Sequence, residues 1–215
     1  MKKVLITGVS RGIGKATAQK FLDEGWSVLG TSTSGESVLK HPNLKTYKLD
    51  VVSPKSIEKF VGQIGELKDK IDVLVNNAGV YPDREDGTMP ISILRKTLEV
   101  NLIGLADLCE RLLPYINRGG HIINISSGAA TITEFSGSYV PAYQISKAAL
   151  NMYTRTLASR LAGKGITVSS FDPGWVKTDM GGKEAPRDPA EEIYELATSK
   201  VDSGYFWRQG KKRSW

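Results

Sequence analysis

The sequence is poor in cysteine, in histidine and in long apolar runs, and each scarcity excludes a class of protein. Because Cys109 is the only cysteine, an internal disulfide and a cysteine-based zinc site are both impossible, and we expect a cytoplasmic protein without a metal centre. No apolar stretch approaches the roughly 18 residues of a membrane span. Residues 1–8 are too short and too soon interrupted by glycine to form a signal peptide. We therefore expect no membrane partner.

The sequence carries more basic than acidic residues, but the basic residues are not gathered in one segment. Lysine and arginine number 29 against 23 acidic residues, which gives a net charge of +6. Apart from Lys211-Lys212-Arg213 the basic residues are scattered, and no zinc-finger, RNA-recognition or basic-zipper pattern accompanies them. We interpret the charge as a solvated surface that helps to attract an anionic cofactor, and we expect no nucleic-acid partner.

Short runs rich in valine and isoleucine alternate with segments of helical spacing. Because the runs are mostly uninterrupted, they predict strands that are buried on both faces of a parallel sheet. The predicted strands are Lys3–Thr7, Ser27–Thr31, Lys45–Leu49, Asp72–Asn76, His121–Ser126 and Thr167–Phe171. The predicted helices are Lys15–Glu24, Pro54–Ile64, Ile91–Ile116 and Ala142–Ala162. This alternation predicts one α/β domain over residues 1–215, a doubly wound parallel sheet of about seven strands with helices on both faces.

The stretch TGVSRGIG at residues 7–14 has two interpretations. As G-x-S-x-G it would be a nucleophile elbow with Ser10 as the nucleophile, and as a glycine-rich turn it would bind a phosphate. Ser10 follows the first strand, so no earlier strand supplies an oxyanion loop. His41 lies in a hydrophilic loop, and His121 is expected at the surface. The turn follows a buried strand and opens a helix, which favours phosphate binding by backbone N–H groups.

Further motifs follow this turn along the chain. They are Asp50-Val51, Asn76-Asn77-Ala78-Gly79, Asn101, Ser126-Ser127, Tyr143-x-x-x-Lys147 and Pro173-Gly174 through Thr178. Together with Thr7-Gly8, Gly12 and Gly14, these motifs make the sequence resemble the short-chain dehydrogenase/reductase family over nearly the whole chain. The ending SGYFWRQGKKRSW is similar to that of small NADPH-dependent carbonyl reductases of this family.

The resemblance implies a Rossmann fold and a catalytic group of four residues. Tyr143 is expected to be the general acid/base, and Lys147 lies one helical turn later, where its charge favours the ionised phenol. Ser127 is expected to hydrogen-bond the substrate oxygen, with Ser126 as the alternative, because strand alternation points the two to opposite faces. By resemblance, Lys147 also holds the nicotinamide ribose, and Asn101 supports a water-mediated proton relay.

The expected cofactor is NADP(H). Enzymes that use NAD usually place an acid at the end of the second strand, whereas Ser32 stands there in this sequence. Arg11 can reach a 2′-phosphate, although Thr33 occupies a position where an arginine would be expected. The residues expected to bind the cofactor are Gly8, Ser10, Arg11, Gly12, Ile13, Gly14, Ser32, Thr33, Asp50, Val51, Asn77, Ala78, Gly79, Tyr143, Lys147, Pro173, Gly174, Val176 and Thr178.

The expected substrate is a small or medium aldehyde, ketone or quinone, because aromatic residues fall on loops at the carboxyl ends of strands. The expected contacts are Tyr81, Phe135, Tyr139, Trp175 and Met180. A β-ketoacyl carrier-protein reductase is the alternative enzyme, and a dinucleotide sensor or scaffold is the alternative without catalysis. The two long helices could form a homodimer or homotetramer, and a monomer is left open.

Overall fold

The fold is built on a mostly parallel sheet, as the alternating pattern predicts. The computed structural model describes residues 1–67, 70–83, 87–135, 137–176 and 188–215, and within them one sheet has the order β3-β2-β1-β4-β5-β6-β7-β8. Neighbouring strands are parallel except that β8 runs antiparallel to β7. The strands are β1 (Lys3–Thr7), β2 (Ser27–Ser32), β3 (Leu44–Lys48), β4 (Ile71–Asn76), β5 (Ile116–Ile125), β6 (Thr167–Phe171), β7 (Tyr205–Arg208) and β8 (Lys211–Arg213).

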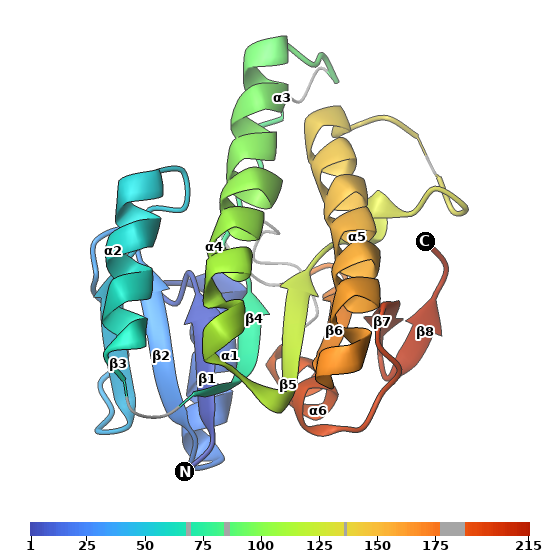
Figure 1. Ribbon diagram of the computed structural model, residues 1–215. Coiled ribbons are helices and arrows are strands. Elements are labelled where there is room, and N and C mark those ends of the chain that lie inside the picture. The colour runs from blue at the N-terminus through green and yellow to red at the C-terminus, as the bar shows by residue number, and fades with distance from the viewer. Residues whose placement is uncertain (68–69, 84–86, 136, 177–187) are drawn as a thin grey trace.

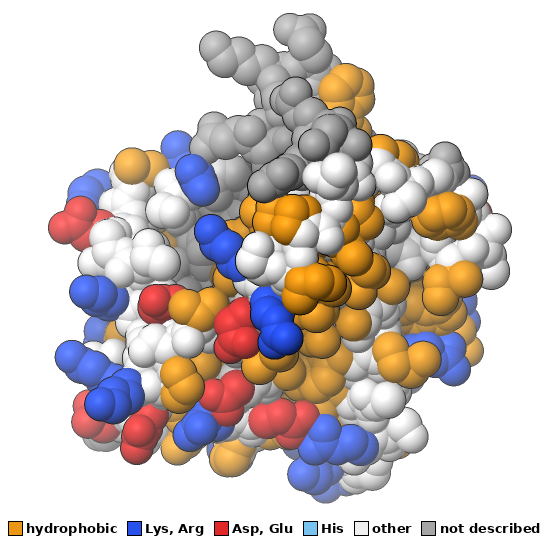
Figure 2. Space-filling view, turned by 90° about the horizontal axis from the view of Figure 1, so that it is seen from above, with side chains coloured by type: hydrophobic (Ala, Val, Ile, Leu, Met, Phe, Trp, Pro, Cys, Tyr) orange, Lys and Arg blue, Asp and Glu red, His pale blue; other side chains and the backbone are white. Residues whose placement is uncertain are grey.

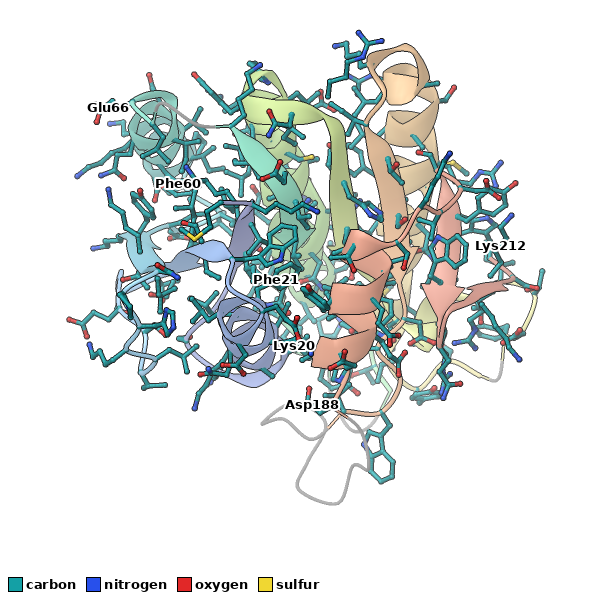
Figure 3. All side chains as sticks on the ribbon, turned by 90° about the horizontal axis from the view of Figure 1, so that it is seen from below. Lys20, Phe21, Phe60, Glu66, Asp188 and Lys212 are labelled. Atoms are coloured by element: carbon teal, nitrogen blue, oxygen red, sulfur yellow. The ribbon has the colours of Figure 1, made fainter. Side chains whose placement is uncertain are left out.

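Helices cover both faces of this sheet (Figure 1). One face carries α2 (Pro54–Gly65), α3 (Ile91–Leu98), α4 (Gly104–Leu112) and α5 (Pro141–Leu161), and the other carries α1 (Gly12–Asp23) and α6 (Ala190–Thr198). Each face has its own hydrophobic core. Phe60 of α2 belongs to one core and Phe21 of α1 to the other, and the two lie on opposite sides of the sheet (Figure 3). Within the described part of the chain, no helix has both the length and the apolar character needed to cross a bilayer.

The predicted helix Ile91–Ile116 is interrupted and ends earlier than expected. A π-helical turn at Glu99–Ile103 joins α3 to α4, and a 3-10 turn at Leu113–Tyr115 closes the segment. Ile116 begins β5 instead, because it pairs with Ile71 of β4 in the sheet. The junction is tight, since a Cβ added to Gly104 would overlap the carbonyl oxygen of Val51.

The prediction that His121 lies at the surface is wrong. His121 is 5% exposed, and its Nε2 lies 2.8 Å from the hydroxyl of Ser169, with which it shares a hydrogen bond. The residue belongs to β5, which lies between β4 and β6 in the sheet, and its ring meets the backbone of Leu196 and Ala197 in α6. Burial lowers the pKa of His121 to about 4. The imidazole is therefore a neutral, hydrogen-bonded core group.

Candidate active site

Most of the predicted site residues meet at one edge of the sheet. Parallel strands bring their carboxyl ends together, so the segments after β1, β4, β5 and β6 are neighbours at this edge. These segments carry Gly8, Asn77, Ser127 and Pro173, and the start of α5 lies above them. Figure 2 looks onto this edge and shows hydrophobic side chains gathered across the middle of the face.

Tyr143 and Lys147 lie on the same side of α5. The Lys147 Nζ atom lies 5.6 Å from the centre of the Tyr143 ring and donates a hydrogen bond of 2.8 Å to the carbonyl oxygen of Ile125. Burial raises the pKa of Tyr143 to about 12 and lowers that of Lys147 to about 8. Desolvation therefore dominates the pKa of both groups, and the lowering of the tyrosine pKa that the sequence led us to expect from the lysine is not found.

Of the two candidate serines, Ser127 is the one that faces Tyr143. Alternation along the chain turns Ser126 into the protein, where its hydroxyl donates a hydrogen bond of 2.7 Å to Asn151 Oδ1. The hydroxyl of Ser127 is close enough to Tyr143 for a hydrogen bond that opposes the rise of the tyrosine pKa. It also accepts a hydrogen bond of 3.2 Å from the amide of Ala129, which holds the turn after β5.

Asn101 connects the segment after β4 to α5. Its side chain is fully buried in the π-helical turn, where Oδ1 accepts from the Val80 amide at 2.8 Å and Nδ2 donates to the Val80 carbonyl at 3.0 Å. Nδ2 also lies 3.1 Å from the hydroxyl of Ser146. A Cβ added to Gly79 would lie 3.2 Å from Asn101 Oδ1 and 3.6 Å from Lys147 Nζ. Asn101 and Lys147 therefore face the same small space beside Gly79.

Asp83 is a site residue that the sequence analysis missed. Its carboxylate accepts hydrogen bonds from the amides of Ala142 at 2.8 Å and Tyr143 at 3.0 Å, and so caps the first turn of α5. The rings of Tyr81 and Tyr143 pack edge to face, with their centres 5.1 Å apart. No local sequence pattern identifies Asp83, because the capped amides lie 59 and 60 residues further along the chain.

The glycine-rich turn forms an open cradle at the start of α1. Gly8 and Gly12 have φ angles of +77° and +54°, which lie in the left-handed region that favours glycine. Among the described residues, the first turn of α1 carries no acidic residue, and the side chain of Arg11 makes no capping hydrogen bond to it. The amide groups at this helix terminus thus fit an anionic group such as the pyrophosphate of a dinucleotide.

Asn77 ties this cradle to the end of β4. Its Nδ2 donates to the carbonyl oxygens of Thr7 and Gly8 at 2.8 and 3.2 Å. The amides of Asn77 and Ala78 both donate to the hydroxyl of Thr7 at 2.9 Å. A Cβ added to Gly14 would overlap the Gly8 carbonyl oxygen, so the first turn of α1 packs directly against the cradle. The predicted cofactor residues of β1 and β4 are brought together here.

The end of β2 carries no carboxylate, since residues 31–34 are Thr-Ser-Thr-Ser. The hydroxyl of Ser32 accepts from the Gly35 amide at 3.0 Å and donates to the Glu36 carbonyl at 2.7 Å, so it closes its own turn. Thr33 and Arg11 are exposed.

The remaining predicted residues fall into four groups. Exposed side chains are those of Ser10, Tyr81, Phe135, Tyr139 and Trp175, whereas Pro173 and Val176 are buried. Ile13, Asp50, Val51 and Gly174 are half-buried. Thr178 and Met180 lie outside the described residues.

Comparison with known proteins agrees with this geometry. Residues 2–189 match the family described as short chain dehydrogenase. The 3-oxoacyl-[acyl-carrier-protein] reductase FabG of Aquifex aeolicus is 35% identical over 217 residues, which cover 95% of this chain and 84% of the relative. The NADPH-bound carbonyl reductase from chicken fatty liver is 29% identical with a TM-score of 0.90, covering 100% of this chain and 94% of that one. The carbonyl reductase Sniffer of D. melanogaster is 26% identical with a TM-score of 0.89, and the match covers both chains completely.

Proposed function

The chain belongs to the short-chain dehydrogenase family, and from that premise we propose that it is an NADPH-dependent carbonyl reductase. Its substrate would be a small or medium aldehyde, ketone or quinone, which it reduces to the alcohol. The observation that carries the proposal is the gathering of Tyr143, Ser127 and Lys147 beside the glycine cradle of Gly8 and Gly12. Bound NADPH would supply the hydride.

In this proposal the chain's own residues supply the proton and orient the substrate. Tyr143, with its pKa raised to about 12, is protonated at neutral pH and donates its proton to the carbonyl oxygen. Ser127 donates a hydrogen bond to the same oxygen. The Lys147 Nζ atom lies 5.6 Å from the centre of the Tyr143 ring, and Asn101 faces the same space beside Gly79 as Lys147 does. We retain the proposed relay role of Asn101 on this basis.

The preference for NADPH rests on two residues at the far end of the cradle. Ser32 leaves the end of β2 without the carboxylate that would repel a 2′-phosphate, and Arg11 stands exposed at the start of α1. The chicken carbonyl reductase, solved with NADPH bound, supports this choice by likeness.

A β-ketoacyl carrier-protein reductase is the second candidate, because the relative from Aquifex aeolicus carries that activity in its name at 35% identity. Exposed aromatic side chains favour a compact carbonyl instead, since Tyr81 packs on Tyr143 and Phe135, Tyr139 and Trp175 offer further flat apolar surface. Specificity constants for aromatic ketones, α-dicarbonyls and acetoacetyl carrier protein separate the two candidates. A tenfold advantage for the carrier-protein substrate would favour the second.

The experiment that tests catalysis is the replacement of Tyr143 by phenylalanine. Loss of the proton donor should lower kcat by roughly two to four powers of ten, while NADPH still binds. Tyr194→Phe is the matched control, because Tyr194 packs on Phe21 at the opposite face of the sheet. Near-normal turnover of Tyr143→Phe would rule the assignment out. NADPH binding by an entirely inactive wild-type protein would favour the sensor or scaffold alternative.

Self-association through the long helices also belongs to the proposal. Ile103, beside α4, and Met152 of α5 are 52% and 63% exposed, and these apolar side chains suit contact with a second copy. A smaller assembly of Met152→Lys in sedimentation analysis would support this contact.

A further inference from the structure

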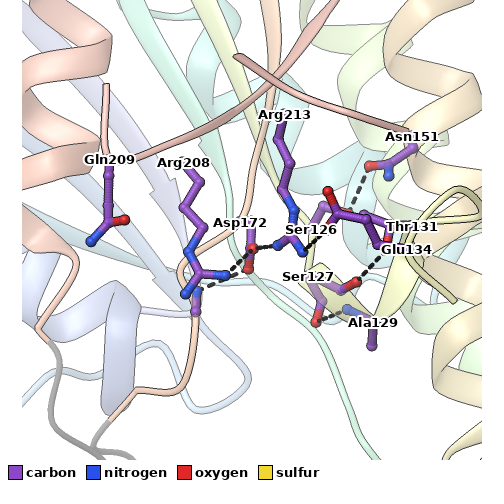
Figure 4. Close-up of polar contacts among 12 residues, drawn as sticks. Ser126, Ser127, Ala129, Thr131, Glu134, Asn151, Asp172, Arg208, Gln209 and Arg213 are labelled. Carbon is purple, nitrogen blue, oxygen red and sulfur yellow. Dashed lines mark hydrogen bonds and ion pairs between the residues drawn. The ribbon is translucent and has the colours of Figure 1, made fainter. Parts of the chain in front are cut away.

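A buried carboxylate lies directly behind the segment that carries Ser127. Asp172 follows β6, is 1% exposed, and accepts a hydrogen bond of 2.9 Å from the amide of Gly174. Such a charge requires compensation inside a protein. It is provided by Arg208 of β7, at 3.3 Å, and by Arg213 of β8, both of which point at the same carboxylate oxygen (Figure 4).

Arg213 extends this contact to the segment that follows β5. Its second nitrogen, Nη2, lies 2.6 Å from the carboxylate of Glu134. A Cβ added to Gly128 would lie 2.6 Å from Arg213 Nη1 and 3.0 Å from Asp172 Oδ2. The backbone immediately after Ser127 therefore packs against the ion pair without room for a side chain.

The C-terminal residue, Trp215, holds the segment after Ser127 at a second point. The amides of Ile132 and Thr133 each donate a hydrogen bond of 3.1 Å to the carbonyl oxygen of Trp215. The Trp215 ring stacks on Phe206 of β7, with centres 5.5 Å apart. In Figure 1 the end of the chain lies beside the segment between β5 and α5. Residues 128–134 are thus held against the β7–β8 hairpin at both ends.

We propose that Arg213 is a positioning residue for Ser127, which it holds in place by clamping the segment 128–134 to Asp172. The inference rests on the proposed function, in which Ser127 binds the substrate oxygen. The ion pair is suited to holding the segment in place, because Asp172 is buried and the side chain of Arg213 is only 18% exposed. Solvent screens such a pair much less than a surface pair. Loss of the guanidinium frees Glu134 and leaves Asp172 with its more distant partner, so Ser127 loses its fixed place.

The first test is the replacement of Arg213 by glutamine. Displacement of a substrate-binding group by about 1 Å should lower kcat by roughly tenfold to a hundredfold. The KM for NADPH should change much less, because the glycine cradle lies on β1 and β4, and because Asp172 keeps Arg208 and its hydrogen bond to the Gly174 amide. Arg213→Lys, which keeps the charge but not the two-pronged contact, should recover part of kcat. Lys212→Gln is the matched control, since Lys212 lies next to Arg213 on β8 but pairs with the exposed Asp202 instead. Equal loss in that control would overturn the inference.

The second test asks whether the effect passes through Ser127. In a Ser127→Ala background, Arg213→Gln should lower kcat no further, because there is no hydroxyl left to position. An additive loss would show that Arg213 acts elsewhere and would refute the proposal. If Ser127→Ala itself keeps full activity, the failure lies with the proposed function. Should Arg213→Gln not fold, Glu134→Gln replaces it, because that variant leaves the buried pair intact; its smaller loss of kcat must also vanish without the Ser127 hydroxyl.

Discussion

Replacement of Asp83 by alanine should reduce both the stability of the protein and its turnover. Asp83 accepts two amide hydrogen bonds at the start of α5, one of them from Tyr143 itself. Loss of an N-terminal cap costs about 0.5–2 kcal/mol, and two bonds to a charged, half-buried acceptor place this residue near 2 kcal/mol. For a chain of 215 residues, each kcal/mol corresponds to about 2–4 °C in Tm, so we expect a loss of about 4–8 °C. The start of the helix should then fray, and kcat should fall with it.

The assay compares Tm by calorimetry with kcat for a ketone substrate, both measured well below the transition. Asp188→Ala is the matched control, because Asp188 accepts a hydrogen bond of 3.0 Å from Ala190 at the start of α6, on the other face of the sheet. We expect that variant to lose stability but to keep kcat. Wild-type kcat in Asp83→Ala despite a lower Tm would refute the idea that this cap positions Tyr143.

Three further predictions follow from other parts of the molecule. Arg11→Ala should raise the KM for NADPH but not that for NADH, and Ser32→Asp should shift preference towards NADH; a wild-type enzyme that prefers NADH would contradict both. Gly104→Ala should destabilise the fold by about 1–3 kcal/mol in urea denaturation, because its methyl group would overlap the Val51 carbonyl oxygen. Stability should fall as pH drops from about 6.5 towards about 4, because His121 stays neutral in the fold but is protonated on unfolding; the slope approaches about 1.4 kcal/mol per pH unit, and should flatten in His121→Asn.

The strands that carry the site could be predicted because their signal is local. Uninterrupted runs of valine, leucine and isoleucine mark β1 and β4 within one residue of their observed ends. The hairpin β7–β8 could not be located in this way, because its strands are short and β8 is entirely basic. The burial of His121 also depends on a non-local fact, the packing of α6 against this part of β5.

The site residues also differ in whether a local sequence pattern predicts them. Tyr143 and Lys147 share a helix face, which their spacing predicts. Alternation predicts that Ser126 and Ser127 point in opposite directions, but only the position of α5 shows which one meets Tyr143. Asp83 reaches Tyr143 across 60 residues of chain, a contact for which spacing gives no signal.

The two outer strands also affect how the protein behaves at high concentration. An edge strand exposes unpaired amide and carbonyl groups, to which a strand of another molecule can add. Here β3 carries Lys45 and Lys48 at one edge, and β8 places Lys211 and Lys212 at the other, so strand addition would bring like charges together. Because β8 covers β7, any change that loosens β8 would uncover a more apolar edge. Aggregation and loss of turnover should therefore appear together in variants that loosen β8, such as Arg213→Gln.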